Sequence, residues 1–286
     1  MINSLTNYNF ILKLRSITGV FDATKIKHGL QAMEYSIQTL ALNEGTIFIS
    51  KGLSTRGIHL SIKENGLDLT LFPFSCDDDW ELLRDWLLVF FTFHSAIVIA
   101  ENDLIEDIEK FFDAEKLKSQ RLIYENLLHH YMHSEETLHF FSVNREFYAG
   151  VKIFERIREQ PEEEQLSYFY AIICKSQYTT LNAENGKVEK IREHLSSTYS
   201  LLNNQGNIVL QPADMLKIQE NPKDEFFISY SSMDKLLRHG WIYLDEKQIY
   251  IPEMPVDEWK LFCTQAKLMS INTELFSKYV EGNEEE

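Results

Sequence analysis

The sequence predicts an α+β protein made of two units, in each of which helices pack on a mixed or antiparallel sheet. One phrase occurs twice, in residues 68–93 and 248–269: a strand-like run, a proline, acidic residues, a tryptophan and an apolar helix. The pair Asn65-Gly66, between two strand-like runs, is the strongest short signal for a hairpin. Each unit is therefore expected to contain a strand–acidic–tryptophan–helix element, with Trp80 in one and Trp259 in the other.

The first half of the chain begins with a strand and an amphipathic helix. Apolar residues recur at spacings of three and four from Ile26 to Leu40, which predicts a helix that ends at Gly45. The run from Asp78 to Phe93 is apolar nearly all round, so this second helix is expected to be buried on two sides. The expected strands span residues 10–14, 46–49, 57–63, 67–72 and 96–100.

The rest of the chain contains more helix signals. Residues 103–134 are expected to be helical in two pieces, and Pro161 with the glutamates that follow it marks another helix start. Further helices are expected over residues 188–202, from Pro212, over 231–239 with a stop at Gly240, and over 256–269. The expected strands are 138–142, 146–151, 207–210, 226–230, 241–244 and 248–251, and the acidic tail 281–286 is expected to fray.

The boundary between the two units is expected where the periodic pattern weakens and acidic residues accumulate, between residues 134 and 160. This places an N-terminal α+β domain at 1–134 and a C-terminal α+β domain at 135–286. No low-complexity linker marks the boundary, so a single packed body is the alternative.

The charge of the chain restricts its partners. The 286 residues contain 44 Asp and Glu against 28 Lys and Arg, a formal net charge of −16. Such a surface repels nucleic-acid phosphates and anionic membranes, and it favours a protein partner, in particular a basic one. Three widely separated cysteines, no signal peptide and no apolar run of roughly 20 residues predict a cytoplasmic protein of bacterial type.

A histidine group is the first candidate for chemistry. Glu125, His129 and His133 follow one another at intervals of four, which places them on one face of a helix, as a metal site requires. The sequence contains no HExxH, and these residues fall on the polar side of the helix. A solvated helix face, with histidines near the favourable C-terminal end, is therefore the preferred interpretation, and no cofactor is predicted.

The acidic residues before the two tryptophans are the second candidate. Asp77, Asp78 and Asp79 could bind a divalent cation, but Asp257 and Glu258 recur in the same place before the second helix. Capping of a helix start explains both sets better. Asp78 and Asp257 are thus expected to start the helices.

The two tryptophans are expected to anchor those helices. Trp80 and Trp259 each fall in the first turn of a helix that follows a strand, where a large aromatic side chain can cover the sheet. The alternative is that they are binding hot spots at an interface. Burial against strands would favour the anchor, and exposure to solvent would favour the interface.

Two further candidates carry weaker signals. Glu101 and Asp103 follow an apolar strand, where carboxylates act as acid or base or, more often, cap the next helix. Cys76 precedes a helix start, which would lower the pKa of its thiol. The sequence contains no GxSxG, GxGxxG or GxxxxGK[ST] motif.

These observations favour a non-enzymatic interaction protein that acts through an acidic surface on a protein partner. Small acidic α+β proteins include immunity proteins that neutralise toxins, and the chain is similar to them in type only. The rival interpretation is an enzyme with a metal-assisted site at His129 and His133. A homo-oligomer subunit remains a third interpretation and predicts a large exposed apolar patch.

Overall fold

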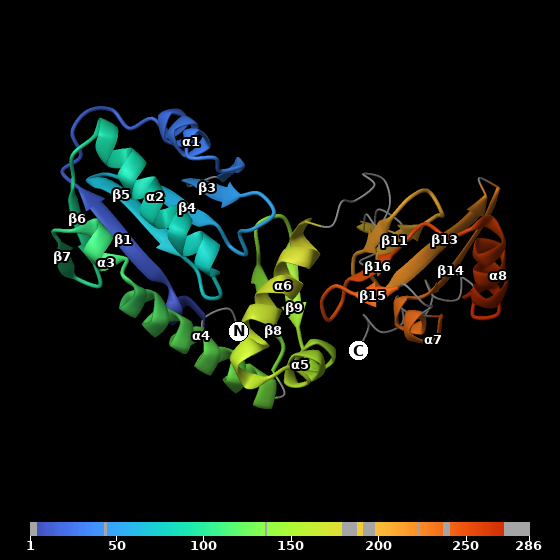
Figure 1. Ribbon diagram of the computed structural model, residues 1–286. Coiled ribbons are helices and arrows are strands. Elements are labelled where there is room, and N and C mark those ends of the chain that lie inside the picture. Colours follow the sequence, from blue (N-terminus) through green and yellow to red (C-terminus); the bar gives the residue numbers. More distant parts are fainter. Residues whose placement is uncertain are drawn as a thin grey trace, which may run out of the picture. The chain divides into compact units, whose positions relative to one another are not determined.

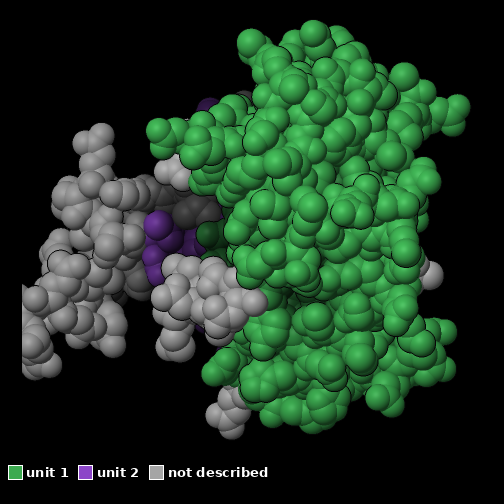
Figure 2. All heavy atoms as spheres, turned by 90° about the vertical axis from the view of Figure 1, so that its left-hand side faces the viewer, with its two compact units in different colours: residues 1–178 green, residues 179–286 purple. Residues whose placement is uncertain are grey.

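The computed structural model describes residues 5–42, 45–134, 136–178, 188–190, 198–221, 223–236 and 241–271. Its contacts divide the chain into two compact units, Met1–Tyr178 and Thr179–Glu286, coloured separately in Figure 2. Each unit combines helices with antiparallel or mixed sheets, so the α+β prediction is confirmed at this level. No helix in the described ranges is long and apolar enough to cross a membrane.

Among the described residues of the first unit, seven strands form one antiparallel sheet in the order β2-β3-β4-β5-β1-β6-β7. The central strand β1 alternates, with Phe10, Leu12 and Leu14 buried on one face and Ile11 exposed on the other. This period of two is the one that a half-covered sheet requires. The strands are β1 (Phe10–Arg15), β2 (Ile37–Leu42), β3 (Gly45–Ser50), β4 (Ile58–Lys63), β5 (Gly66–Leu71), β6 (Ile97–Ala100) and β7 (Asp103–Ile105).

Helices α1 (Ala23–Ala32) and α2 (Asp77–Phe93) cover the buried face of this sheet (Figure 1). Helix α2 is buried on several sides, as its apolar pattern predicts, because it lies between the strands and α1. The two helices approach closely at Gly29, where an added Cβ would lie 2.3 Å from Cγ1 of Val89. The sequence around Gly29 thus permits a helix contact that a larger residue would prevent.

The predicted helix from Ile26 to Leu40 is wrong in its second half. Helix α1 ends at Ala32, and Glu34 adopts a left-handed conformation with φ 68°. Strand β2 follows, and Ile37 pairs with Ser50 of β3. The spacing of three between Ile37 and Leu40 fits a helix, but in the strand it places the two side chains on opposite faces, Ile37 in the core with α2 and Leu40 against the cluster of Ile47, Ile49 and Val143. Pairing with β3 decided the outcome because it satisfies the backbone hydrogen bonds of this segment.

A second core completes the first unit. It contains helices, a short hairpin and five aromatic rings that lie in contact, those of Phe74, Tyr124, Phe140, Phe147 and Phe169. Its elements are α4 (Ala114–His133), β8 (Leu138–Phe141), β9 (Glu146–Ala149), α5 (Val151–Arg158), the 3-10 turn η2 (Glu162–Glu164) and α6 (Gln165–Tyr178). The short helix α3 (Ile108–Phe111) packs instead against the core of the seven-stranded sheet. Helix α5 was absent from the sequence expectations.

The boundary expected between residues 134 and 160 falls inside this core. Phe74, from the connection between β5 and α2, lies 5.1 Å from the ring of Phe169 and 5.8 Å from that of Tyr124. The residues on both sides of the expected boundary therefore bury their apolar surface together. The observed division, after Tyr178, leaves this core intact.

The second unit contains two small sheets. Its described residues form the sheets β10-β11-β13-β14 and β12-β16-β15, and α8 packs on β13 and β14. The core includes Trp241, Trp259 and Phe262. The elements are β10 (Val188–Lys190), β11 (Thr198–Leu202), β12 (Ile208–Leu210), β13 (Met215–Asn221), β14 (Asp224–Ser229), η3 (Tyr230–Ser232), α7 (Met233–Leu236), β15 (Ile242–Tyr243), β16 (Ile249–Ile251) and α8 (Val256–Lys267).

Two helices expected in this unit are strands. Where the structure describes residues 188–202, it shows β10 and β11, and β11 pairs in parallel with β13. The helix expected from Pro212 is also absent, because β13 begins at Met215 and pairs with β14. From Leu216 onward the burial alternates, with Leu216 and Ile218 buried and the residues after each of them partly exposed, so the period is two. Residues 237–240, which include the Gly240 stop, and the tail 281–286 lie outside the described residues.

Candidate functional site

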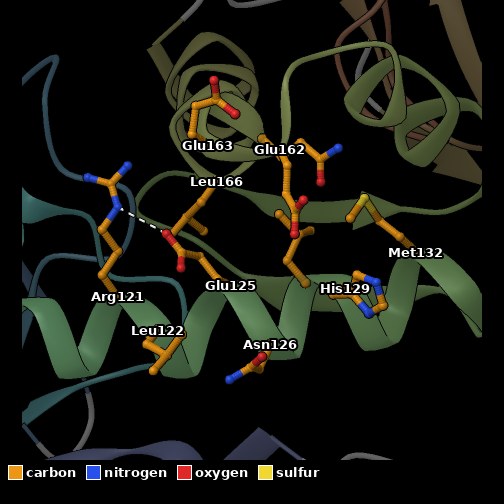
Figure 3. Close-up of a pocket in the computed structure, with 11 residues that line it drawn as sticks. Arg121, Leu122, Glu125, Asn126, His129, Met132, Glu162, Glu163 and Leu166 are labelled. Atoms are coloured by element: carbon orange, nitrogen blue, oxygen red, sulfur yellow. Dashed lines mark hydrogen bonds and ion pairs between the residues drawn. The ribbon is translucent and has the colours of Figure 1, made fainter.

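An open groove of about 600 Å³ lies in the first unit between α4 and the segment formed by η2 and α6 (Figure 3). Its apolar lining includes the buried side chains of Leu128, Met132 and Leu166. Charged and polar side chains make up most of the rest. The groove is lined by Arg121, Leu122, Glu125, Asn126, Leu128, His129, Met132, Glu162, Glu163, Gln165 and Leu166.

The periodicity of α4 places the polar groups in the groove. Tyr124 and Leu128 of this helix are buried in the core, and Arg121, Glu125 and His129 repeat every four residues on the adjoining face. Figure 3 shows Arg121 and Glu125 rising from α4 toward the opposite wall. This helix is thus apolar toward the core and charged toward the groove.

The opposite wall begins at a proline. Pro161 precedes η2, and its restricted backbone suits the first turn of a helix. Glu162 and Glu163 follow it and are exposed to solvent. In Figure 3 the side chain of Glu162 extends toward α4. The expected acidic helix start after Pro161 is therefore also the acidic wall of the groove.

Arg121 joins three elements at one end of the groove. Its Nη2 donates to Oγ of Ser167 at 2.8 Å, its Nε lies 3.3 Å from Oε1 of Glu125, and its Nη1 lies 3.6 Å from Oδ2 of Asp77. These groups belong to α6, α4 and α2. The guanidinium thus neutralises Glu125 in part and fixes this end of the groove.

Glu162 and Glu163 leave the groove with a negative charge. Within the described residues, neither carboxylate has an ion pair, whereas Arg121 is shared with Glu125 and Asp77. The lining has three carboxylates against one arginine, with His129 the other titratable group. The groove can therefore accept a positively charged group from outside the protein.

The predicted metal ligands share a helix face, but they make other contacts. Nδ1 of His133 lies 2.8 Å from the backbone oxygen of His129, and the two imidazole rings stack with 4.1 Å between centroids. Glu125 and His129 line the groove. In the described part of the chain, no group of three or more His, Cys, Asp or Glu side chains could hold a metal. Metal binding by Glu125, His129 and His133 stays a prediction.

Among the acidic residues before Trp80, Asp79 makes the most contacts. Its carboxylate is fully buried and accepts backbone N–H groups of Thr55, Arg56 and Gly57 at 2.9–3.2 Å and that of Cys76 at 3.1 Å. The hydroxyl of Thr55 lies 2.9 Å from the same carboxylate. Asp79 therefore joins the start of α2 to the loop between β3 and β4. The sequence alone does not distinguish this residue from its neighbours Asp77 and Asp78.

The other acidic residues occupy the first turns of their helices. Asp78 is the second residue of α2, with Cys76 at the N-cap, and Asp257 is the second residue of α8, with Pro255 at the N-cap. Burial, followed by the charges of Asp79 and Asp77, raises the pKa of Asp78. Both residues thus lie in the first turn, two positions after the N-cap, where the helix dipole favours acids.

Arg56 belongs to the loop between β3 and β4 that the carboxylate of Asp79 holds. Its guanidinium is 4.2 Å from the ring centroid of Phe140 and 5.1 Å from that of Phe72. Burial lowers the pKa of Arg56 to about 10, and the charge of Asp79 opposes this effect. The arginine links the loop to the second core through its contact with Phe140.

The remaining candidates have structural positions. Glu101 and Asn102 form the turn between β6 and β7 with φ 54° and 74°, so the expected helix cap is a hairpin turn. Trp80 and Trp259 are 2% and 6% exposed and lie in hydrophobic cores. Burial raises the pKa of Cys76 well above its usual value, and this effect outweighs the helix start expected to lower it.

Fold and groove together define an α+β protein with an open, acidic groove in its first unit. The chain belongs to the family described as "Domain of unknown function (DUF4299)", whose model matches residues 2–225. This match covers the first unit and part of the second. No curated protein and no solved structure matches the chain.

Proposed function

We propose that this protein is a non-enzymatic interaction module that holds a basic segment of a protein partner in the groove between α4 and α6. The supporting observation is that two features occur in the same groove. One is the carboxylates of Glu162 and Glu163, which have no ion pair among the described residues, and the other is an apolar lining. The net charge of −16 extends the same preference over the whole chain. A toxin-immunity role is one form that such binding could take.

The groove suits lysine and arginine side chains. The methylene stem of such a residue can lie over Leu128, Met132 and Leu166 while its charged head reaches the glutamates. Arg121 already occupies one end in a similar way, since its guanidinium contacts Glu125 and Ser167. A second cation would meet carboxylates that Arg121 does not reach.

The test replaces three groove glutamates with glutamine, giving E125Q/E162Q/E163Q. The tagged full chain captures partners from the native host at low salt, and each captured protein is then purified and titrated against the wild type and the variant. We expect the variant to bind at least about tenfold more weakly, since each lost charge pair contributes on the order of 1 kcal/mol. We also expect added salt to weaken the wild-type complex.

A matched control separates the groove from the overall charge. The variant E64Q/E81Q/E109Q removes the same charge at three exposed glutamates outside the groove lining. It should bind as the wild type does. An equal loss of affinity in both variants would mean that binding depends on the overall charge and not on the groove. Unchanged affinity in E125Q/E162Q/E163Q would contradict the proposal.

The alternative is a metal-assisted enzyme, and one observation supports it: Glu125 and His129 line the same groove. Incubation with zinc, iron or manganese, followed by gel filtration and elemental analysis, tests this alternative. Retained metal that is lost in H129Q/H133Q would support the enzyme. Protein free of all three metals would eliminate it.

A further inference from the structure

Two cysteines from distant parts of the first unit converge on one backbone oxygen. The thiol of Cys76 lies 3.4 Å from the carbonyl oxygen of Leu53, and the thiol of Cys174 lies 3.2 Å from the same atom. The distance between the two sulfur atoms therefore cannot exceed the sum of these two S···O distances. Both thiols are free in this structure.

We propose that Cys76 and Cys174 form an oxidation site in which a disulfide joins the start of α2 to α6. This proposal is independent of the proposed binding function. It rests on the shared acceptor Leu53, since two thiols that contact one oxygen need only side-chain rotation and a small backbone shift to meet. Cys76 is the N-cap of α2, and Cys174 lies in α6.

The burial of the two thiols differs and sets the order of events. Cys76 is buried, whereas Cys174 is partly exposed and is the one that an oxidant reaches first. Burial raises the pKa of Cys174 to about 12 and that of Cys76 well above its usual value. Both thiols are therefore protonated at neutral pH, so the reaction is slow and accelerates as the pH rises.

The chemistry balances with an azo oxidant such as diamide. The thiolate of Cys174 adds to one nitrogen of the N=N bond, and the other nitrogen takes up a proton. The sulfur of Cys76 then attacks that of Cys174, the S–N bond breaks, and the S–S bond forms. The two thiols lose two electrons and two protons, and diamide leaves as the hydrazine.

The disulfide would affect the loop between β3 and β4, which contains Leu53, as well as helices α2 and α6. The carbonyl oxygen of Leu53 would lose both thiol donors, and the crosslink would join the sheet layer to the core that contains α6. Such a crosslink closes a long loop and limits the unfolded chain. We expect the melting temperature of the oxidised protein to rise by about 5 °C or more.

The full-length protein, treated with diamide at pH 8.5, tests the proposal. We expect a monomer lighter by two hydrogen atoms, a Cys76–Cys174 peptide in a non-reducing digest, and reversal by dithiothreitol. Cys263 is the control, because it lies in the second unit and burial also raises its pKa to about 12. The C263S variant should form the crosslink, and the C174S and C76S variants should not.

Two outcomes would overturn the inference. One is diamide adducts on separate cysteines with no crosslinked monomer. The other is a disulfide that includes Cys263 at the same rate. C174S alters a partly exposed residue, so we expect this variant to fold, and circular dichroism checks that it does. A folded C174S that still loses two hydrogen atoms on diamide treatment would also contradict the proposal.

Discussion

Replacing Asp79 by asparagine tests whether the buried carboxylate anchors the loop between β3 and β4 to α2. In the wild type, Oδ2 accepts the N–H groups of Thr55, Arg56 and Cys76, and Oδ1 accepts that of Gly57. Asparagine has one acceptor oxygen. Its best orientation keeps that oxygen at the Oδ2 position and turns the amide NH₂ toward the N–H of Gly57.

The expected cost follows from these contacts. Each hydrogen bond that changes from a charged to a neutral acceptor loses about 1 kcal/mol, and the donor left facing another donor costs about 1–3 kcal/mol. The variant no longer buries the carboxylate charge, which offsets part of this loss, but it also removes the negative charge that faces the buried guanidinium of Arg56. We expect a net decrease of about 2–4 kcal/mol in the free energy of unfolding.

Urea unfolding at pH 7, followed by circular dichroism, measures this effect. With a slope of about 2 kcal/mol/M, the midpoint for D79N should fall by about 1–2 M. Asp78 supplies the control, because it precedes Asp79 in the same helix turn and none of the described hydrogen bonds involves its side chain. D78N should stay within about 0.5 kcal/mol of the wild type.

A midpoint for D79N that matches that of D78N would refute this reasoning. It would mean that the loop keeps its conformation without the carboxylate, so that the hydrogen bonds of Asp79 add little to stability. A large loss in both variants would point to the helix dipole instead, since the two aspartates occupy the same turn.

Further predictions concern both units. In Gly29→Ala the new Cβ would clash with Val89, so thermal denaturation should show a decrease of about 1–3 kcal/mol in the free energy of unfolding. No decrease would mean that α1 can shift away from α2. Trp259→Ala should cost about 3–5 kcal/mol in urea, and a smaller effect would contradict its burial. The hydrogen bond from Lys267 lowers the pKa of Asp224 in the folded protein. The contribution of this interaction to folding stability is therefore present at neutral pH and is lost as the pH falls below about 4. Asp224→Asn should therefore flatten the acid side of a stability–pH curve, and an unchanged curve would contradict the pair.

Much of the fold could be predicted where local pattern and tertiary contacts agree. The hairpin of β4 and β5, helix α2 and the hairpin of β15 and β16 were all expected from alternation, turn residues or apolar periodicity. The expectation failed where a helical spacing of apolar residues occurs in a strand that packs on both faces. Ile37 and Leu40 continue a helical spacing, yet they lie in β2, because an edge of the sheet offered hydrogen bonds to that segment.

The candidate site was predictable only in part. Glu125 and His129 were singled out from their spacing, but the groove needs Glu162 and Glu163, which lie more than thirty residues later in the sequence. An acidic helix start after Pro161 was visible, and nothing in the sequence placed it opposite α4. The shared acceptor of Cys76 and Cys174 was equally hidden.

The sequence by itself determined the α+β class, the excess of negative charge and most of the local elements, because these depend on composition and on neighbours a few residues apart. Only the tertiary structure decided the end of the first unit, the role of Asp79 and the walls of the groove. These depend on contacts between residues distant in the chain, such as Phe74 with Phe169. Such contacts form because buried apolar surface and buried polar groups must find partners wherever the chain brings them together.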